Sequence, residues 1–355
     1  MRLDELGWNT FFCNHFDQLG TPGLVPARIV REDRRVYRAH GEDGELDAEL
    51  AGWFRHRVDA VTQLPAVGDW VGVKPQLSER KATIRAVLPR QTAFSRKVAG
   101  VHTEEQVVAA NIDTVFLVSA LGREFNLRRL ERYLTLAWNN GPDPVLLLNK
   151  ADLCADVDAY MAQAQAVAAG VPVYALSART GQGVEVFYQY LCRGRTVALL
   201  GSSGVGKSTL INALLGEQRQ RVDSIRESDG RGKHTTTRGE LILMPTGGML
   251  IDTPGMRELQ LWADEDSLVG AFADIEHLAT QCRFRDCQHE TEPGCAINIA
   301  VERGVLAQGR LDNYLDMKQE LVRLASRHAH KVSLKDKASR QKATRRARRR
   351  QRDEP

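Results

Sequence analysis

The stretch Gly201-Ser202-Ser203-Gly204-Val205-Gly206-Lys207-Ser208 decides the fold of the middle of this chain. An apolar run that predicts a strand, TVALL, precedes it, and one that predicts a helix, TLINALL, follows. This order is typical of a P-loop, in which backbone N–H groups at a helix N-terminus surround phosphate oxygens. We predict that Lys207 reaches the β- and γ-phosphates of a nucleotide and that the Ser208 hydroxyl binds Mg²⁺. The predicted phosphate-binding residues are Gly201, Ser202, Ser203, Gly204, Val205, Gly206, Lys207, Ser208 and Thr209.

A second phosphate-sensing motif, Ile251-Asp252-Thr253-Pro254-Gly255, ends another apolar strand. Asp252 can hold Mg²⁺ through water, and the Gly255 N–H can contact the γ-phosphate, so we count Gly255 with Lys207 among the catalytic groups. The polar stretch from Gly230 to Thr237, GRGKHTTT, precedes this motif and is typical of a switch loop. One of its threonines, Thr236 or Thr237, is expected to complete the Mg²⁺ shell.

Two further motifs predict that the base is guanine. Asn149-Lys150-Ala151-Asp152 follows the apolar run VLLL and resembles the NKxD motif of GTPases. A carboxylate at Asp152 accepts two guanine donors that adenine lacks, while Asn149 would brace the loop and the Lys150 stem would cover the base. Ser177-Ala178, after VYAL, resembles the partner motif whose backbone N–H meets guanine O6. The ligand is therefore expected to be GTP or GDP, bound with Mg²⁺.

The order of these motifs is unusual for a GTPase. NKAD precedes Ser177-Ala178, which precedes the P-loop and then DTPG, whereas most GTPases begin with the P-loop. A parallel sheet accepts this order if the domain is circularly permuted, because chain termini in compact domains often lie close together. The chain after DTPG then leads directly into the C-terminal region, so nucleotide state can be coupled to what that region binds.

The remaining pattern predicts a multidomain chain. Short β-rich runs and turns between Gly23 and Lys97 predict a small antiparallel barrel, for which a five-stranded oligonucleotide-binding (OB) fold is a candidate that the pattern does not distinguish from other small barrels. We expect core burial for Trp70.

Apolar runs then alternate with helical segments, as in a parallel α/β sheet. The expected strands are Thr114–Val118, Val145–Leu148, Val173–Leu176, Val197–Leu200, Leu241–Met244 and Met249–Ile251, and the expected helices are Leu127–Asn139, Val157–Ala169, Val184–Leu191, Lys207–Leu215 and Leu311–Arg327.

Three cysteines and a histidine crowd into a short segment of the helical C-terminal part. Cys282, Cys287, His289 and Cys295 supply three thiolates and one imidazole, enough for a closed tetrahedral Zn²⁺ shell. A closed shell predicts a structural ion. Disulfide use is the alternative, and it would leave one cysteine of the cluster unpaired.

Charge is divided unevenly along the 355 residues, whose formal net charge is +4. From Arg327 onward there are 12 Lys and Arg against 3 Asp and Glu, so this end carries +9 and the first 326 residues carry −5. Such a tail, without aromatic residues, is expected to bind phosphates through counterion release, or else only to add solubility.

The composition predicts a soluble cytoplasmic protein that does not bind membranes. The hydrophobic content is 43%, there is no long apolar run, and Asp4 and Glu5 lie where a signal peptide would need apolar residues.

The permuted motif order, the GKHTTT segment, the preceding barrel and the later Cys/His cluster together resemble the ribosome-small-subunit-dependent GTPase A family (RsgA/YjeQ). The resemblance covers residues 23–327. It implies an OB-like barrel, a permuted P-loop GTPase domain and a small, mostly helical zinc-binding domain. It also implies GTP hydrolysis during late assembly of the 30S ribosomal subunit, stimulated by that subunit and its rRNA and coupled to release. The domains are then expected at 1–22 (extension), 23–98 (barrel), 99–262 (GTPase), 263–327 (zinc-binding) and 328–355 (tail).

The resemblance also bears on the catalytic residue. Met256 stands where Ras-like GTPases place a water-orienting glutamine. The family assigns that part to a switch-loop histidine, and the matching residue is His234, whose neutral imidazole can orient water. Contact of His234 with rRNA or solvent is the alternative.

Two other functions compete with a 30S-dependent GTPase. One is a GTP-responsive RNA-binding module whose turnover is incidental, and the other is a permuted GTPase that acts on the large subunit. We expect a monomer in each case.

Overall fold

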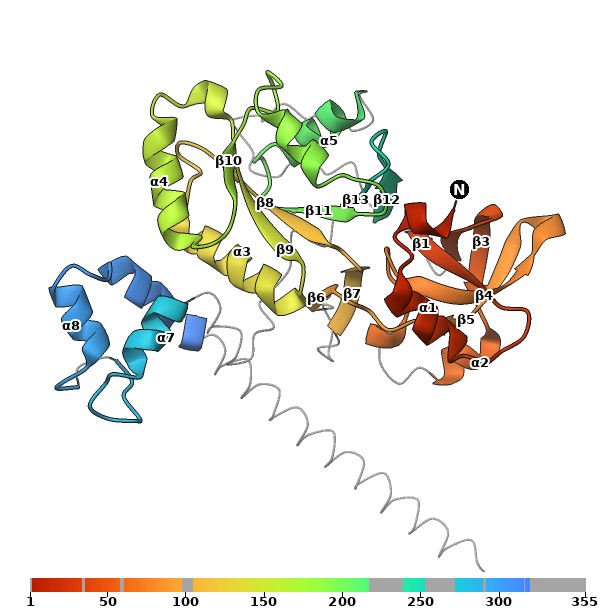
Figure 1. The fold of residues 1–355 in the computed structure, drawn as a ribbon, viewed down its shortest axis with the longest axis horizontal. Helices are drawn as coiled ribbons and strands as arrows, with labels where there is room; N and C mark the ends of the chain where they lie inside the picture. Colours follow the sequence, from red (N-terminus) through yellow and green to blue (C-terminus); the bar gives the residue numbers. More distant parts are fainter. Residues whose placement is uncertain are drawn as a thin grey trace, which may run out of the picture. The chain divides into compact units, whose positions relative to one another are not determined.

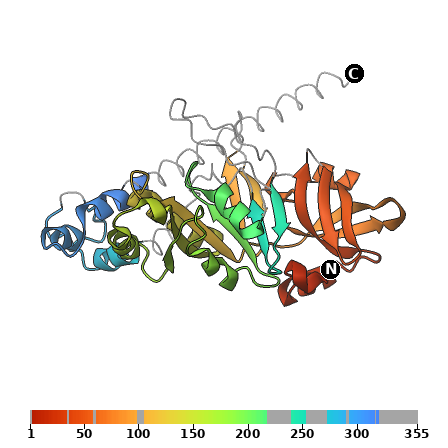
Figure 2. The same cartoon turned by 90° about the horizontal axis from the view of Figure 1, so that it is seen from above.

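The computed structural model describes residues 2–33, 36–57, 61–97, 105–216, 239–252, 272–289, 292–315 and 317–319. The chain forms two compact units, residues 1–260 and 261–355. The first holds a β-barrel and an α/β sheet, and the second holds the Cys/His cluster (Figures 1 and 2). The predicted fold class is confirmed.

Five strands close into a barrel near the N-terminus. They are β1 (Val25–Asp33), β2 (Val36–Gly41), β3 (Gly44–Leu50), β4 (Trp70–Gln76) and β5 (Lys81–Val87). Their order is β1-β2-β3-β5-β4, and pairing of β4 with β1 closes the ring, with β3 and β5 parallel and the other pairs antiparallel. Short helical turns η2 (Val61–Gln63) and η3 (Leu77–Glu79) and helix α2 (Gly52–Arg57) complete this part.

The barrel core follows the alternation of each strand. In β3, Leu46, Ala48 and Leu50 are buried between exposed acidic residues. Inward residues from all five strands form one apolar cluster with them. Trp70 is fully buried, as predicted.

The N-terminal segment packs on this barrel. It contains a 3-10 turn, η1 (Leu3–Leu6), and helix α1 (Thr10–Asp17), whose first N–H groups are capped by the Asn9 side chain. Ring centroids of Trp8 and Phe12 lie 4.6 Å and 5.8 Å from that of Trp70. The segment therefore shields the end of β4.

A short antiparallel pair, β6 (Ala93–Lys97) and β7 (Glu105–Ala110), leads from the barrel into the α/β sheet. That sheet contains β8 (Thr114–Ala120), β9 (Asp143–Asn149), β10 (Val173–Ala175), β11 (Thr196–Leu200), β12 (Glu240–Leu243) and β13 (Met249–Asp252). The parallel order is β10-β9-β8-β11-β13. The helical elements are α3 (Leu127–Asn140), η4 (Ala151–Leu153), α4 (Val157–Val167), η5 (Val184–Gln189) and α5 (Lys207–Leu215).

Two expectations for this sheet are wrong in detail. The expected parallel strand at Leu241–Met244 is β12, which runs antiparallel to β13 because the tight turn from Met244 to Gly248 joins the two as a hairpin. The helix expected at Val184–Leu191 is the 3-10 helix η5, which begins at Gly183 with φ 75° and turns with i to i−3 hydrogen bonds.

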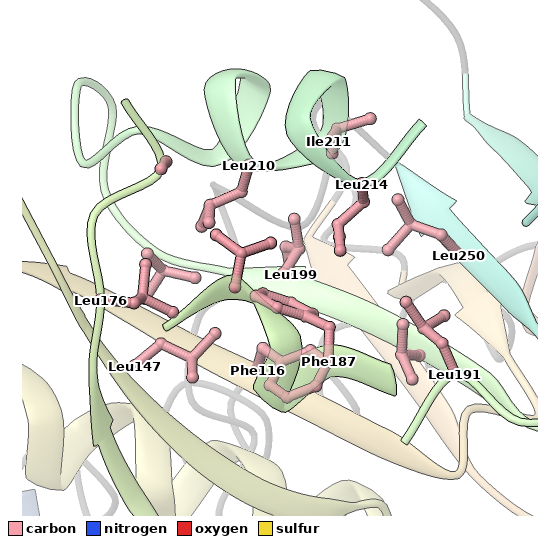
Figure 3. Packing of buried hydrophobic residues seen from close by; sticks show 14 of the residues in the cluster. Phe116, Leu147, Leu176, Phe187, Leu191, Leu199, Leu210, Ile211, Leu214 and Leu250 are labelled. Carbon is pink, nitrogen blue, oxygen red and sulfur yellow. The ribbon is translucent and has the colours of Figure 1, made fainter. Parts of the chain in front are cut away.

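Both faces of the sheet are covered. On one face, Leu210, Ile211 and Leu214 of α5 and Phe187 of η5 pack on Phe116 and its neighbours (Figure 3). Helices α3 and α4 contact β8, β9 and β10. Because side chains alternate along each strand, the buried residues outside this cluster belong to the opposite face. The sheet therefore has a packed apolar core beside the carboxyl edge of its strands.

The second unit is described by α7 (Ala273–Ala279), α8 (Ala296–Glu302) and a helical segment, residues 308–315. Arg310 joins the last segment to α7 through two hydrogen bonds to the Asp274 carboxylate, 2.7 Å and 2.8 Å long. The helix expected from Leu311 thus begins earlier, and its end lies outside the described residues, as does the basic tail. Within the described part of the chain, no helix is long and apolar enough to cross a membrane.

Candidate guanine-nucleotide site and metal centre

The topology gathers the predicted motifs at one edge of the sheet. Strands β9, β10, β11 and β13 are parallel, and each is followed at its carboxyl end by a motif. In open α/β sheets this edge is where ligands bind. The P-loop follows β11. On one side of β11 lies β13, which ends at Asp252, and on the other side lie β9 and β10, which lead into the Asn149 and Ser177 loops. Motifs that are far apart in sequence thus share one site.

The P-loop is held closed around the Lys207 ammonium group. Lys207 Nζ donates to the carbonyl oxygens of Gly201 and Ser202, both at 2.6 Å, and the side chain is 8% exposed. Gly206 has φ 99° and begins α5, so a side chain there would be strained. A Cβ at Gly206 would also lie 2.2 Å from Asn149 Nδ2. Glycine is therefore required here both by the backbone conformation and by the close approach of Asn149.

The base side of the site is a network among the three loops. Asn149, which is 2% exposed, donates from Nδ2 to the Val205 carbonyl (2.7 Å) and accepts at Oδ1 from the Ala178 N–H (2.9 Å). Asn149 thus connects the P-loop to the loop that carries Ala178. Ser177 Oγ donates to Asp152 Oδ1 at 2.7 Å, which orients that carboxylate. Hydrogen bonds thus link the loops that carry Asn149, Asp152 and Ala178 to one another and to the P-loop.

Lys150 stands in the left-handed region at φ 66°, and its Nζ lies 3.4 Å from Glu124 Oε2. This tie from NKAD to the segment after β8 was not foreseen from the sequence. The two residues are 26 positions apart, and no sequence motif indicates a contact between them.

Helix α3 also reaches the P-loop. Arg129 Nη1 donates to Ser202 Oγ at 2.7 Å, and Tyr133 OH lies 3.2 Å from the same oxygen. Sequence patterns predicted α3 but not this contact, because nothing in the spacing links residues 73 positions apart. The two side chains fix the serine whose carbonyl holds Lys207.

The predicted Mg²⁺ ligands are described only in part. Ser208 is in the first turn of α5, and Asp252 is the last residue of β13. A hydroxyl and a carboxylate are the hard oxygen ligands that Mg²⁺ prefers, so the donor set fits the ion. His234, Thr236, Thr237 and Gly255 lie outside the described residues.

The Cys/His cluster brings four possible metal ligands close together. The ligand atoms of Cys282, Cys287, His289 and Cys295 all lie within 4.8 Å of one another. Cys282 Sγ is 3.9 Å from Cys295 Sγ, and His289 Nδ1 is 3.7 Å and 3.6 Å from these two sulfurs. His289 has φ 67°, which turns its ring back toward the cysteines. These four residues could hold one metal ion.

Burial shifts the pKa values of two side chains in this cluster. Burial raises the pKa of the Cys287 thiol to about 11 and lowers the pKa of His289. Without a cation the thiol would stay protonated at neutral pH, whereas a bound cation favours the thiolate. Binding of a metal ion by these residues would therefore release protons from their thiols.

Comparison with known proteins identifies the family. A sequence model of the RsgA GTPase family matches residues 87–262. The small ribosomal subunit biogenesis GTPase RsgA of Opitutus terrae is 44% identical over 336 residues, which cover 92% of this chain and 92% of that protein. The protein of the same name from Xylella fastidiosa is 47% identical over 308 residues, 85% of this chain and 87% of its own.

Solved structures agree with the sequence comparison. The crystal structure of YjeQ from Thermotoga maritima matches with a TM-score of 0.64 and 29% identity, covering 84% of this chain and 99% of that one. YloQ, described as a circularly permuted GTPase, matches with a TM-score of 0.60 and 25% identity, covering 84% and 95%. The predicted circular permutation is thereby confirmed. The chain belongs to the RsgA GTPase family and is a GTP hydrolase.

Proposed function

We propose that this protein hydrolyses GTP while bound to the assembling small ribosomal subunit. The observation that carries the proposal is the convergence of the P-loop, NKAD and Asp252 at one sheet edge in a chain whose relatives are named small ribosomal subunit biogenesis GTPases. Hydrolysis would be stimulated by the subunit and coupled to release. A protein with this task would act as a monomer in the cytoplasm.

Each residue of the site has a proposed part. Asp152 accepts the N1 and N2 donors of guanine, and Ser177 keeps its carboxylate oriented through the 2.7 Å hydrogen bond. Lys207 moves from, or shares, the carbonyls of Gly201 and Ser202 to bind the β- and γ-phosphates. Ser208 and Asp252 would hold Mg²⁺, which supplies charge neutralisation to the phosphates when bound.

The switch residues are proposed on the sequence alone. His234 would orient the attacking water in place of the glutamine that Met256 replaces, Gly255 would contact the γ-phosphate, and Thr236 or Thr237 would complete the Mg²⁺ shell. Ordering of these loops by the subunit would supply the missing preorganisation and raise a slow intrinsic rate.

We propose that the ion in the Cys/His cluster is structural zinc. In a tetrahedral site with Zn–S near 2.3 Å and Zn–N near 2.0 Å, two sulfurs are about 3.8 Å apart and a sulfur and a nitrogen about 3.6 Å. The distances of 3.9 Å, 3.7 Å and 3.6 Å within the cluster support this geometry. Four protein ligands leave no open position for a substrate.

The test is multiple-turnover GTP hydrolysis with no subunit, with 30S subunits and with 50S subunits. We expect many-fold stimulation by 30S alone, and co-sedimentation with 30S in the presence of a non-hydrolysable GTP analogue. Unchanged hydrolysis with GTP-dependent binding would instead favour an RNA-binding module, and stimulation by 50S would favour a large-subunit factor. His234→Ala should lose the stimulation while keeping GTP affinity.

A further inference from the structure

A buried arginine lies where the barrel meets the α/β sheet. Arg28, in β1, is 1% exposed. Its Nη1 donates to the Leu6 carbonyl at 2.5 Å and lies 3.3 Å from Met249 Sδ. Its Nη2 donates to the Asn111 carbonyl at 2.9 Å, and its Nε donates to the Gly68 carbonyl at 3.1 Å. One guanidinium thus joins the N-terminal segment, the barrel, the strand leading into the sheet and β13.

The acceptors of Arg28 among the described residues are three carbonyls and a thioether, with no carboxylate in direct contact. Burial lowers the pKa of Arg28 to about 10, while the more distant charges of Asp113 and Asp69 favour its charged form. At neutral pH the side chain is therefore a charged group. A buried cation is costly unless its hydrogen bonds are complete, so the four segments must keep their positions around it.

The same joint contains a direct backbone connection. Arg31 of β1 is in register with Glu240 of β12, and Glu240 is in register with Asp252 of β13. Met249, the contact of Arg28, is the first residue of β13, and Asp252 is the last. The barrel therefore contacts the first residue of β13 directly, through Arg28, and reaches the last residue, Asp252, only through Glu240 of β12.

The packing around Gly68 leaves little room for the joint to slide. A Cβ at Gly68 would lie 2.1 Å from the Ala110 carbonyl oxygen and 3.0 Å from Ile251 Cδ1. Asn111, at φ 56°, donates from Nδ2 to the Gly68 carbonyl at 3.1 Å and accepts the Gln91 N–H at 2.9 Å. A side chain at Gly68 would therefore be blocked by Ile251, the residue next to Asp252.

We propose that Arg28 is a positioning residue for Asp252, through which the barrel sets the affinity of the site for Mg²⁺-nucleotide. The proposal rests on the function proposed above in that it takes Asp252 as a Mg²⁺ ligand. Coupling between sites is reciprocal, so a partner that shifts the barrel against β13 changes Mg²⁺-nucleotide affinity, and bound Mg²⁺-nucleotide changes affinity for that partner by the same factor.

The experiment measures the affinity of the full-length protein for fluorescent GDP with excess Mg²⁺ and with chelator. The ratio of the two affinities isolates the Mg²⁺-dependent part of binding. Arg28→Gln should lower this ratio about fivefold or more, with the affinity in chelator unchanged. Arg38→Gln is the matched control, because Arg38 lies in β2 of the same barrel, is 48% exposed and, among the described residues, forms ion pairs with Glu45 and Asp47 at the surface. Its ratio should equal that of the wild type.

Two further variants keep the result decisive. Met249→Leu removes the thioether acceptor at nearly constant volume, so it should fold and lower the ratio in the same direction even if Arg28→Gln does not fold. Asp252→Asn tests the assignment on which the proposal rests. A lowered ratio in Asp252→Asn with wild-type ratios in the folded Arg28 and Met249 variants would overturn the positioning role alone. A wild-type ratio in Asp252→Asn would overturn the Mg²⁺ assignment and the proposal together.

Discussion

At the scale of single residues, base selectivity is expected to depend on the carboxylate of Asp152. Asp152→Asn replaces an acceptor with an amide that presents a donor, so GTP affinity should fall about a hundredfold, and xanthosine triphosphate, with a carbonyl at C2, should bind better than GTP. Equilibrium binding of GTP, ATP and xanthosine triphosphate measures this change. Asp158→Asn in the first turn of α4 removes the same charge and should leave all three affinities unchanged. Retained GTP preference in Asp152→Asn would exclude the assigned role.

The contact between Arg129 and Ser202 gives a second prediction at this scale. Because Ser202 holds Lys207 through its carbonyl, Arg129→Ala and Ser202→Ala should each weaken GTP binding by about three- to tenfold, and the double variant should be no weaker than the worse single variant. Arg123→Ala removes an exposed charge from the segment before α3 and serves as control. Strictly additive losses would mean that the two side chains act independently.

At the scale of elements, the metal centre is expected to hold the second unit together. Stripping the ion, or replacing Cys287 with serine, should abolish the cooperative unfolding of residues 261–355 while GTP binding by residues 1–260 persists. Since the raised pKa of Cys287 favours the thiol, protons compete with the metal, and metal affinity should fall as pH is lowered. Metal analysis and calorimetry at several pH values measure both effects. Cys192→Ser, at an exposed cysteine outside the cluster, should retain one ion per chain.

At the scale of the whole molecule, the basic tail and the folded domains are expected to contribute differently to binding of the 30S subunit. The tail of +9 should add salt-sensitive affinity for rRNA, while the folded domains supply specificity. Deletion of residues 327–355 should weaken 30S association and reduce its dependence on salt concentration, with GTP affinity unchanged. A full-length chain whose tail lysines and arginines are all replaced by glutamine should behave like the deletion. The same salt dependence in either variant and the wild type would show that the tail does not contact phosphates.

Local motifs were sufficient to predict the chemistry of this protein. The P-loop, NKAD and the Cys/His spacing are short, and each needs only its own residues and a neighbouring strand or turn, so the family, the permutation and the metal-binding cluster were all predictable. The direction of β12 was predicted wrongly, because the hairpin turn to β13 sets the direction of this strand and its composition does not.

Contacts between distant segments were decided only by the packed molecule. Arg129 on Ser202, Lys150 beside Glu124, and Arg28 among Leu6, Gly68, Asn111 and Met249 join residues with no pattern in common. Sequence motifs specify which groups bind a ligand, because that chemistry is local. The distances between those groups, and the link from the barrel to Asp252, depend on how the sheet and barrel close around a shared buried charge.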